Sequence, residues 1–317
     1  MVPGSADPNQ HPSVIASILE RDSKHVAHVE TIVLHAFALS LPEKHFTSVA
    51  RVLDLLPQTE KMVLKDFLFV IPCPSIPTLF SHLTSFTSLR FENSWLSANV
   101  FNMLAELNLD NLAIPGGNNT SVDRAKLTTE ASAFFSRLLS FEFVADGEGD
   151  LPGLPLNYQW LKDIEFNRLQ HLDLTISDEH GINVMNDILL KAPQTVALGL
   201  KMTFGEALHT TIVLDLSHLI YLHNLTLTVD ETGLSVATEG ISTMTHATLQ
   251  SIVLALQTEI ANSAMVAFDS VIVDCADPEE FVSMTVRRCN GAAIRRKWMQ
   301  DSLPLLTEAH GQKISAA

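Results

Sequence analysis

Residues 169–176, LQHLDLTI, carry the apolar pattern L-x-x-L-x-L, which recurs along the second half of the chain. The pattern returns in 195–202 (TVALGLKM, with threonine at the first position), 222–229 (LHNLTLTV) and 249–256 (LQSIVLAL), at spacings of 26, 27 and 27 residues. Apolar residues that alternate over a short run predict a β-strand with one buried edge. The recurrence therefore predicts one strand per repeat.

Looser copies extend the series toward both ends of the chain. Taking the fourth position of each copy as an anchor, the predicted anchors are Ile32, Phe67, Leu89, Leu112, Phe141, Leu172, Leu198, Leu225, Ile252 and Val271. Two registers overlap in 104–114, and we take the later one, Leu109-Leu112-Ile114, because it keeps the spacing even. A recurrence of about 20 to 29 residues is typical of leucine-rich repeats. We expect an α/β fold, an irregular leucine-rich-repeat solenoid (horseshoe) with a parallel concave sheet and outer helices.

The segments between the predicted strands contain apolar residues at helical spacing. We expect helices over 13–20, with Val14, Ile15, Ile18 and Leu19 on one face, over 42–56, over 130–137 and from Pro278 to about Cys289. The loops are predicted at 115–119 and 145–155, where glycine, asparagine and proline gather. As domains we expect a disordered tail over 1–12, the repeats over 13–277, a helical C-terminal cap over 278–309 and a tail over 310–317.

The composition of the chain favours some classes of binding partner over others. The formal net charge is −16, which argues against binding to nucleic acid or to an anionic membrane and favours protein partners. The three cysteines, Cys73, Cys275 and Cys289, are scattered and not in a metal spacing, as expected for a reducing compartment. The N-terminal residues do not resemble a secretory signal, and the apolar runs are too short to span a membrane. We expect a cytoplasmic or nuclear protein.

The clusters of residues that could form a catalytic or metal-binding site give only weak signals. His25, His28 and His35 lie near one another in sequence, but we expect surface histidines and no metal site. The triplet Asp178-Glu179-His180 is expected to be a solvated loop. The basic residues Arg287, Arg288, Arg295, Arg296 and Lys297 are expected on the exposed face of terminal helices, or in a patch for an acidic partner or a nuclear-localisation signal. We expect no enzyme, no metal and no cofactor.

Residues 13–312 resemble the leucine-rich-repeat region of fungal F-box proteins, in particular those of mushroom-forming fungi. The phrases that carry the resemblance are SVIASILERDSKHVAHVETIVLHAF, NDILLKAPQTVALGLKM, LIYLHNLTLTV, ATLQSIVLAL and the closing RRKWMQDSLPLLTEAHGQKI. The resemblance implies the substrate-recognition part of a cullin-type ubiquitin ligase, with a Skp-type adaptor as partner if an F-box is present. The nearest F-box candidate is 41–57, LPEKHFTSVARVLDLLP, which we interpret as the helix of the first repeat. The alternative is a leucine-rich-repeat adaptor or inhibitor unrelated to ubiquitin.

The exposed side of the predicted strands is the candidate binding surface. In each strand the triplet residues point into the core, so the residues between them line the exposed concave face. The candidates for partner binding are Arg90, Glu92, His171, Asp173, Thr175, Lys201, Asn224, Thr226 and Thr228. Over the centre of this surface the residues are small and polar, which leaves room for a protein segment and lacks the converging titratable groups of an active site.

Overall fold

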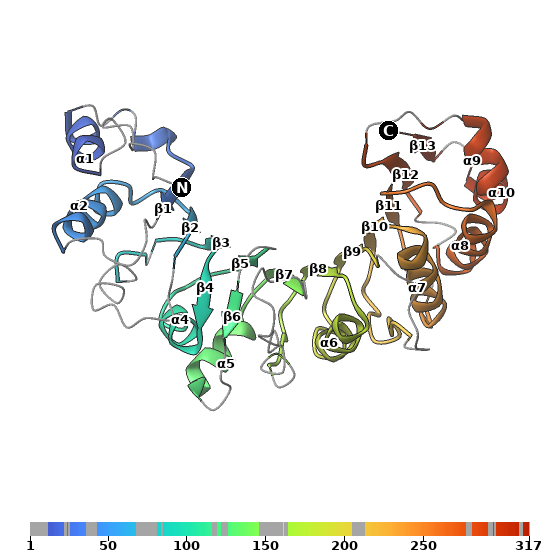
Figure 1. Ribbon diagram of the computed structural model, residues 1–317, viewed down its shortest axis with the longest axis horizontal. Coiled ribbons are helices and arrows are strands. Elements are labelled where there is room, and N and C mark those ends of the chain that lie inside the picture. Colours follow the sequence, from blue (N-terminus) through green and yellow to red (C-terminus); the bar gives the residue numbers. More distant parts are fainter. Residues whose placement is uncertain are drawn as a thin grey trace. The chain divides into compact units, whose positions relative to one another are not determined.

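The computed structural model divides into two compact units, Met1–Phe134 (unit 1) and Phe135–Ala317 (unit 2) (Figure 1). It describes residues 12–21, 24, 26–35, 43–67, 81–83, 85–115, 119–121, 126–145, 161, 164–204, 213–246, 248–276, 281–290, 294, 296–310 and 313–316. The expected tail 1–12 lies outside these residues except for Pro12, and so does the loop 145–155 except for Ala145.

Unit 1 is a parallel sheet in the order β1-β2-β3-β5, with helices in the connections. Its described elements are α1 (Pro12–Arg21), η2 (Val26–His28), β1 (Thr31–His35), α2 (Glu43–Asp54), β2 (Lys61–Lys65), β3 (Ser88–Glu92), β4 (Trp95–Ser97), α4 (Ala98–Leu104), β5 (Asn111–Ile114), β6 (Asn119–Ser121) and α5 (Thr129–Phe135). Strands β4 and β6 form a separate two-stranded parallel sheet. Asn119, expected in a loop, is the first residue of β6.

Unit 2 repeats the same strand-and-helix plan. Its described elements are β7 (Ser140–Ala145), β8 (His171–Ile176), α6 (Glu179–Leu190), β9 (Ala197–Met202), β10 (Asn224–Val229), α7 (Glu231–Ser242), β11 (Ser251–Leu256), α8 (Asn262–Cys275), β12 (Ser283–Arg288), α9 (Arg296–Ser302), α10 (Pro304–His310) and β13 (Ile314–Ala316). The strands lie in the order β7 to β13, each parallel to the next. Helices α6, α7 and α8 stand along one side of the strands (Figure 1).

The leucine triplets of unit 2 form the ladder that the recurrence predicts. Leu172, Leu198, Leu225 and Ile252 are register partners on consecutive strands, as are Leu174, Leu200, Leu227 and Leu254. All eight are at most 4% exposed. Because parallel strands in register stack like positions above one another, each repeat covers the apolar row of the previous one.

Backbone hydrogen bonds at the start of each strand stabilise this register. The carbonyl oxygen of Gln170 accepts the N–H groups of both Val196 and Ala197, and the carbonyl of Val196 accepts those of His223 and Asn224. The same two-to-one arrangement recurs at Leu139, His223 and Gln250 in unit 2, and at Glu60 and Thr87 in unit 1. Since each buried polar group must find a partner, this repeated arrangement fixes where every new strand begins.

Two helices of unit 2 begin with the same sequence motif, Asp-Glu-x-Gly. The Asp178 side chain accepts the N–H of Gly181 at 2.7 Å, and Asp230 accepts that of Gly233 at 2.7 Å. Each aspartate is thus the N-cap of its helix. The glycine is needed because a Cβ at Gly233 would lie 2.4 Å from the carbonyl oxygen of Met202. Asp178 therefore has a structural role, although we expected a solvated loop.

In unit 1 the structure corrects the register of β2. We placed the triplet at Leu64-Phe67-Phe69, but Met62 and Leu64 are the buried partners of Leu89 and Phe91, so the triplet is Thr59-Met62-Leu64. Both readings have the right spacing, although the observed one has a buried threonine, Thr59, at its first position. Asp66 decides between them, because its left-handed backbone (φ 62) turns the chain out of the strand before Phe67. The later register chosen within 104–114 is confirmed, since Leu112 pairs with Leu89.

The structure also shows which sides of the unit 1 helices are buried. Helix α2 occupies the segment predicted to be the first repeat helix and buries Val49, Val52 and Leu53. In α1, however, Val14 and Ile18 are 37% and 50% exposed, whereas Ala16 and Leu19 are buried. The buried face is the one that contacts α2, so the partner helix decides which side of α1 is covered.

A second correction concerns the C-terminal region. The strand anchored at Val271 is wrong, because residues 262–275 form α8, whose buried positions Met265, Phe268, Ile272 and Cys275 follow a helical period. The helix expected from Pro278 to about Cys289 is also wrong. Its residues 283–288 form β12, with Phe281, Met284 and Val286 as the buried triplet. The segment expected to be a closing tail contains β13.

The fold class is α/β, with open parallel sheets built from strand-and-helix repeats of the leucine-rich-repeat type, as predicted. The described sheets hold four strands in unit 1 and seven in unit 2, without counting β4 and β6. In the part of the chain that the structure describes, no helix has the length and apolar character needed to cross a bilayer.

Candidate functional site

The exposed side of β7–β12 brings together most of the predicted binding residues. His171, Asp173 and Thr175 alternate with the buried leucines of β8, and Asn224, Thr226 and Thr228 do so in β10. The register aligns them in three rows: His171, Ala197, Asn224, Ser251 and Ser283; Glu142, Asp173, Gly199, Thr226, Val253 and Thr285; Thr175, Lys201, Thr228, Ala255 and Arg287. We call these residues the unit 2 face.

Small side chains dominate the centre of the unit 2 face. Between Asp173 and Arg287 the rows contain mainly alanine, glycine, serine and threonine. Six strands about 4.8 Å apart give this surface a width of about 24 Å, the length of an extended peptide of about seven residues. Short side chains leave the backbone of a bound segment close to the sheet, so the surface can hold a polypeptide.

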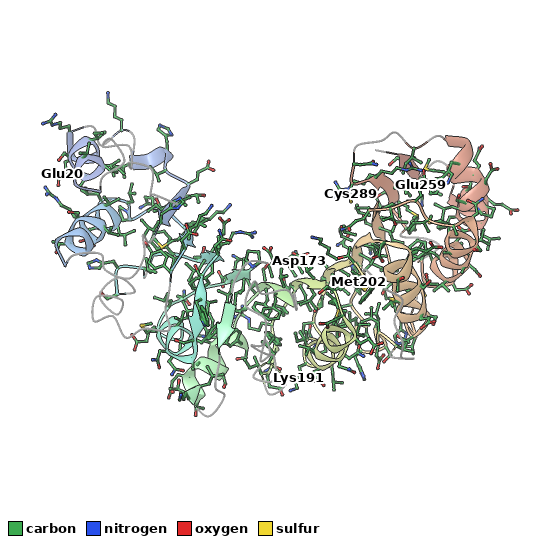
Figure 2. All side chains as sticks on the ribbon, viewed as in Figure 1. Glu20, Asp173, Lys191, Met202, Glu259 and Cys289 are labelled. Atoms are coloured by element: carbon green, nitrogen blue, oxygen red, sulfur yellow. The ribbon has the colours of Figure 1, made fainter. Side chains whose placement is uncertain are left out.

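One end of the unit 2 face is acidic. Glu142 and Asp173 are register partners on β7 and β8. Burial raises the pKa of Asp173 above its ordinary value, and the neighbouring charge of Glu142 raises this pKa further, whereas His171 opposes both. Asp173 leans over Gly199 of the next strand, where a Cβ would lie 1.8 Å from its Oδ1 atom. Figure 2 shows Asp173 on the side of the strands away from Lys191, which follows α6.

A basic residue, Arg287 of β12, lies at the other end, with Ala255 between it and Thr228. Lys201 belongs to β9, next to the acidic end, where it pairs with Thr175. We expected Arg287 and Arg288 on a terminal helix. They lie in β12 instead, and Arg288 Nη1 is 3.8 Å from Glu259 Oε1. Arg296 and Lys297 do lie in a helix, α9, whereas Arg295 is outside the described residues.

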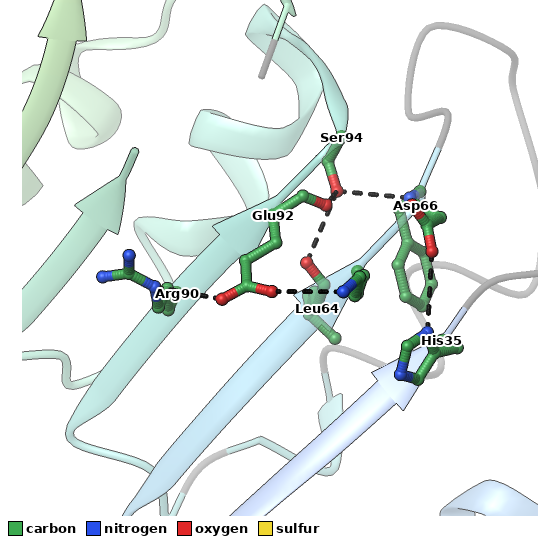
Figure 3. Close-up of polar contacts among 8 residues, drawn as sticks. His35, Leu64, Asp66, Arg90, Glu92 and Ser94 are labelled. Carbon is green, nitrogen blue, oxygen red and sulfur yellow. Dashed lines mark hydrogen bonds and ion pairs between the residues drawn. The ribbon is translucent and has the colours of Figure 1, made fainter. Parts of the chain in front are cut away.

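The predicted residues Arg90 and Glu92 lie on the exposed side of β3 in unit 1, so they belong to a separate surface. Their neighbours there are His35 and Lys65, on β1 and β2. Glu92 lies between two cations: its Oε1 accepts from Arg90 Nε at 3.3 Å, and its Oε2 is 3.7 Å from Lys65 Nζ (Figure 3). His35 Nδ1 lies 3.5 Å from Asp66 Oδ2.

The turns after β2 and β3 hold this charged group in place. Asp66 and Asn93 both have left-handed backbone conformations, which aspartate and asparagine tolerate better than most residues. The buried Ser94 hydroxyl donates to the Glu92 carbonyl at 2.9 Å and accepts the N–H of Phe67 at 3.2 Å. Figure 3 shows this link between the ends of β2 and β3.

Four charged residues on the exposed sides of the strands are not among the predicted binding residues. Glu142 stands between Phe141 and Phe143, so the alternation rule that selected Asp173 could have found it. Lys61 and Lys65 were missed because the register assigned to β2 was wrong, and Arg287 was expected on a terminal helix because a helix was predicted where β12 lies. Among the described residues, which include His28 and His35, no cluster of three histidine, cysteine or acidic side chains could hold an ion. His25 itself lies outside them.

The fold and these faces define a repeat scaffold of the leucine-rich-repeat type. No protein-family model matches the chain, and no curated protein matches it. Among solved structures, the chain is similar to one in the crystal structure of the Rad7 and Elc1 complex in yeast, with a TM-score of 0.42 and 13% sequence identity. The match covers 92% of this chain and 87% of that chain. At this TM-score and identity the likeness carries no inference about activity or partner.

Proposed function

We propose that this chain is a non-catalytic scaffold that holds a segment of a partner protein against the exposed faces of its strands. The observation that carries the proposal is the unit 2 face, where register pairing over six consecutive strands aligns mostly small side chains between Glu142 and Asp173 at one end and Arg287 at the other. A surface about 24 Å wide with charge at both ends and short side chains between them suits an extended polypeptide.

We further propose that the partner is a substrate of a cullin-type ubiquitin ligase and that the chain is the recognition part of an F-box-like protein. The resemblance of residues 13–312 to fungal F-box repeat regions supports this step. The proposed site of action is the cytoplasm or the nucleus. An adaptor or inhibitor unrelated to ubiquitin is the second candidate, favoured by α2: the segment nearest to an F-box is a repeat helix between β1 and β2, and its apolar side is buried.

Photo-crosslinking from single positions tests the scaffold function. Benzoylphenylalanine replaces Thr226 on the unit 2 face in one variant and Ser235 on the exposed side of α7 in the control, and each is irradiated in extract of the source cell. We expect a protein adduct at position 226 that is absent at position 235. Adducts that form equally at both positions, or only at 235, would contradict the proposal.

The same complexes distinguish the two candidates for the partner. If the chain serves a ubiquitin ligase, we expect a Skp-type adaptor and a cullin to be recovered together with the position 226 adduct. Deleting 41–57 is not a clean test, because it removes the buried residues Val52, Leu53 and Leu56. A better variant is Asp54→Asn, on the exposed side of α2, because it leaves the buried apolar residues in place and keeps an oxygen 2.8 Å from His82 Nδ1; loss of adaptor and cullin from the complex of this variant would support the ligase candidate. Recovery of the adduct without adaptor or cullin would favour the unrelated adaptor or inhibitor.

A further inference from the structure

The exposed side of the unit 1 sheet is basic in a chain of net charge −16. Its positions on the three strands β1–β3 are Thr31, Val33, His35, Lys61, Val63, Lys65, Ser88, Arg90 and Glu92. We call these residues the unit 1 face. Lys61, Lys65 and Arg90 are basic and Glu92 is the one acidic residue among them. The charge of this face is therefore opposite to that of the whole chain.

An apolar centre separates the basic side chains. Val33 is 51% exposed and pairs with Val63, which in turn pairs with Arg90. Along β2 the face reads Lys61, Val63, Lys65, with successive members two residues apart. In a strand two residues rise about 6.6 Å, so the two lysines stand about 13 Å apart with the valine between them.

The interactions of Glu92 show that this face can bind a carboxylate group. One carboxylate places an oxygen near each of two cations, 3.3 Å from Arg90 Nε and 3.7 Å from Lys65 Nζ. A carboxylate from another chain would meet the same donors, while Lys61 offers a second cation at the other end of β2. Glu92 neutralises one of the three positive charges, so a surplus is left for a ligand.

We propose that the unit 1 face binds an extended, acidic protein segment in which acidic side chains at positions i and i+4 flank an apolar side chain at i+2. The spacing matches Lys61, Val63 and Lys65, because a strand-like segment has the same rise per residue as β2. The apolar member would cover the exposed surface of Val33 and Val63. This proposal rests on the proposed scaffold function and specifies the chemistry of one partner.

The same basic residues could attract a nucleic acid, and the rest of the face argues against it. Phosphate backbones are bound by arrays of cations, whereas here a valine pair holds the centre and Glu92 lies between two of the cations. The strong negative charge of the whole chain would also repel a polyanion. Both obstacles are smaller for a short acidic segment with an apolar side chain. It carries fewer negative charges than a nucleic acid, and its apolar side chain can cover the valine pair.

Selection from a random dodecapeptide display library on the full-length chain tests the proposal. The test variant is Lys61→Glu, and the matched control is Lys126→Glu, an exposed lysine of unit 1 outside the face with the same change of charge. We expect the parent and the control to enrich peptides with the acidic, apolar, acidic spacing, and the Lys61→Glu variant to lose that enrichment.

An enriched peptide then allows the contacts to be weighed by fluorescence anisotropy. We expect Lys61→Glu to weaken binding about fivefold at physiological salt and less at high salt, where charges are screened. Val33→Asp should weaken it about tenfold through loss of the apolar contact together with repulsion of the acidic side chains of the peptide, with Val213→Asp, at an exposed valine of unit 2, as control. Glu92→Gln should strengthen binding about threefold, because the competing carboxylate is removed while its backbone contacts stay.

Several results would overturn the proposal. These are no enrichment on the parent, enrichment without acidic residues, or equal enrichment on Lys61→Glu and Lys126→Glu. Binding of a fluorescent single-stranded decanucleotide that exceeds peptide binding and depends on Lys61 would assign the face to nucleic acid instead. If the adduct at position 226 forms while the acidic selection fails, only this inference falls. If both fail, the scaffold function falls with it.

Discussion

Asp269 of α8 should be one of the most sensitive positions in unit 2. Its side chain is fully buried, and its two oxygens accept the backbone N–H groups of Leu305 at 2.7 Å and Leu306 at 2.9 Å. These N–H groups belong to the first turn of α10, which has no partner for them within the helix. Asp269 therefore caps a helix that is distant in sequence and stabilises the packing of α10 on α8.

The magnitude of this contribution follows from the two hydrogen bonds. Hydrogen bonds to a charged group contribute about 1.5–3 kcal/mol each, so the gross stabilisation is about 3–6 kcal/mol. Burial of the carboxylate offsets part of it. Asp269→Ala leaves two buried N–H groups unsatisfied, and we expect a net loss of about 2–4 kcal/mol. Asp269→Asn keeps an acceptor oxygen and should lose less.

Hydrogen exchange of the peptide that contains Leu305 and Leu306 measures this loss locally. Since about 1.4 kcal/mol corresponds to a factor of ten, protection should fall about 30-fold to several-hundredfold in Asp269→Ala. The matched control is Asp274→Ala, at an exposed aspartate of the same helix. Unchanged protection in Asp269→Ala, or an equal fall in the control, would refute the assignment of Asp269 as the cap of α10.

The pH dependence of Asp269 has a definite sign. Burial raises its pKa, more than its hydrogen bonds to Leu306 and Leu305 lower it. The folded state therefore binds the proton more tightly than the unfolded state, whose pKa is about 3.9. The stability that this group contributes is present at low pH and is lost as pH rises through the folded pKa. In urea unfolding, the parent should lose stability relative to Asp269→Asn over this range.

Three further predictions concern the core and the faces. Leu225→Ala should cost about 2–5 kcal/mol in urea unfolding because it opens a cavity in the ladder, whereas Thr226→Ala on the exposed side should change stability by less than about 0.5 kcal/mol; equal effects would contradict the register. Gly199→Ala should cost less than about 1 kcal/mol in urea unfolding, because its Cβ meets only the end of the exposed Asp173 side chain, which can turn away; a loss above about 2 kcal/mol that Asp173→Ala/Gly199→Ala recovers would show that Asp173 is held in place. Trp95→Phe should cost only the packing of the smaller ring, about 1–2 kcal/mol, because the buried Trp95 indole N–H has no hydrogen-bond partner in the described structure; a loss above about 4 kcal/mol in urea unfolding would contradict this.

A local sequence pattern predicts the strand register correctly where only one register fits it. In β8–β11 one strong triplet per repeat left no competing register, and the buried ladder through Leu172, Leu225 and Ile252 is confirmed. At β2 and β12 two readings competed. The segment 281–288 has the triplet Phe281, Met284, Val286, yet a helix signal from Pro278 was preferred. The binding role of the nine candidate residues remains a prediction.

The sequence by itself determined the repeat, the α/β class and the alternation that puts Asp173, Thr226 and Arg90 on exposed sides of strands, because these depend on neighbours within six residues. Only the tertiary structure decided which charges meet across strands. Glu142 beside Asp173, Glu92 between Lys65 and Arg90, and Asp269 under α10 join residues from different repeats. Strand register and helix packing set such pairs, and both are properties of the whole folded unit, which a local pattern does not contain.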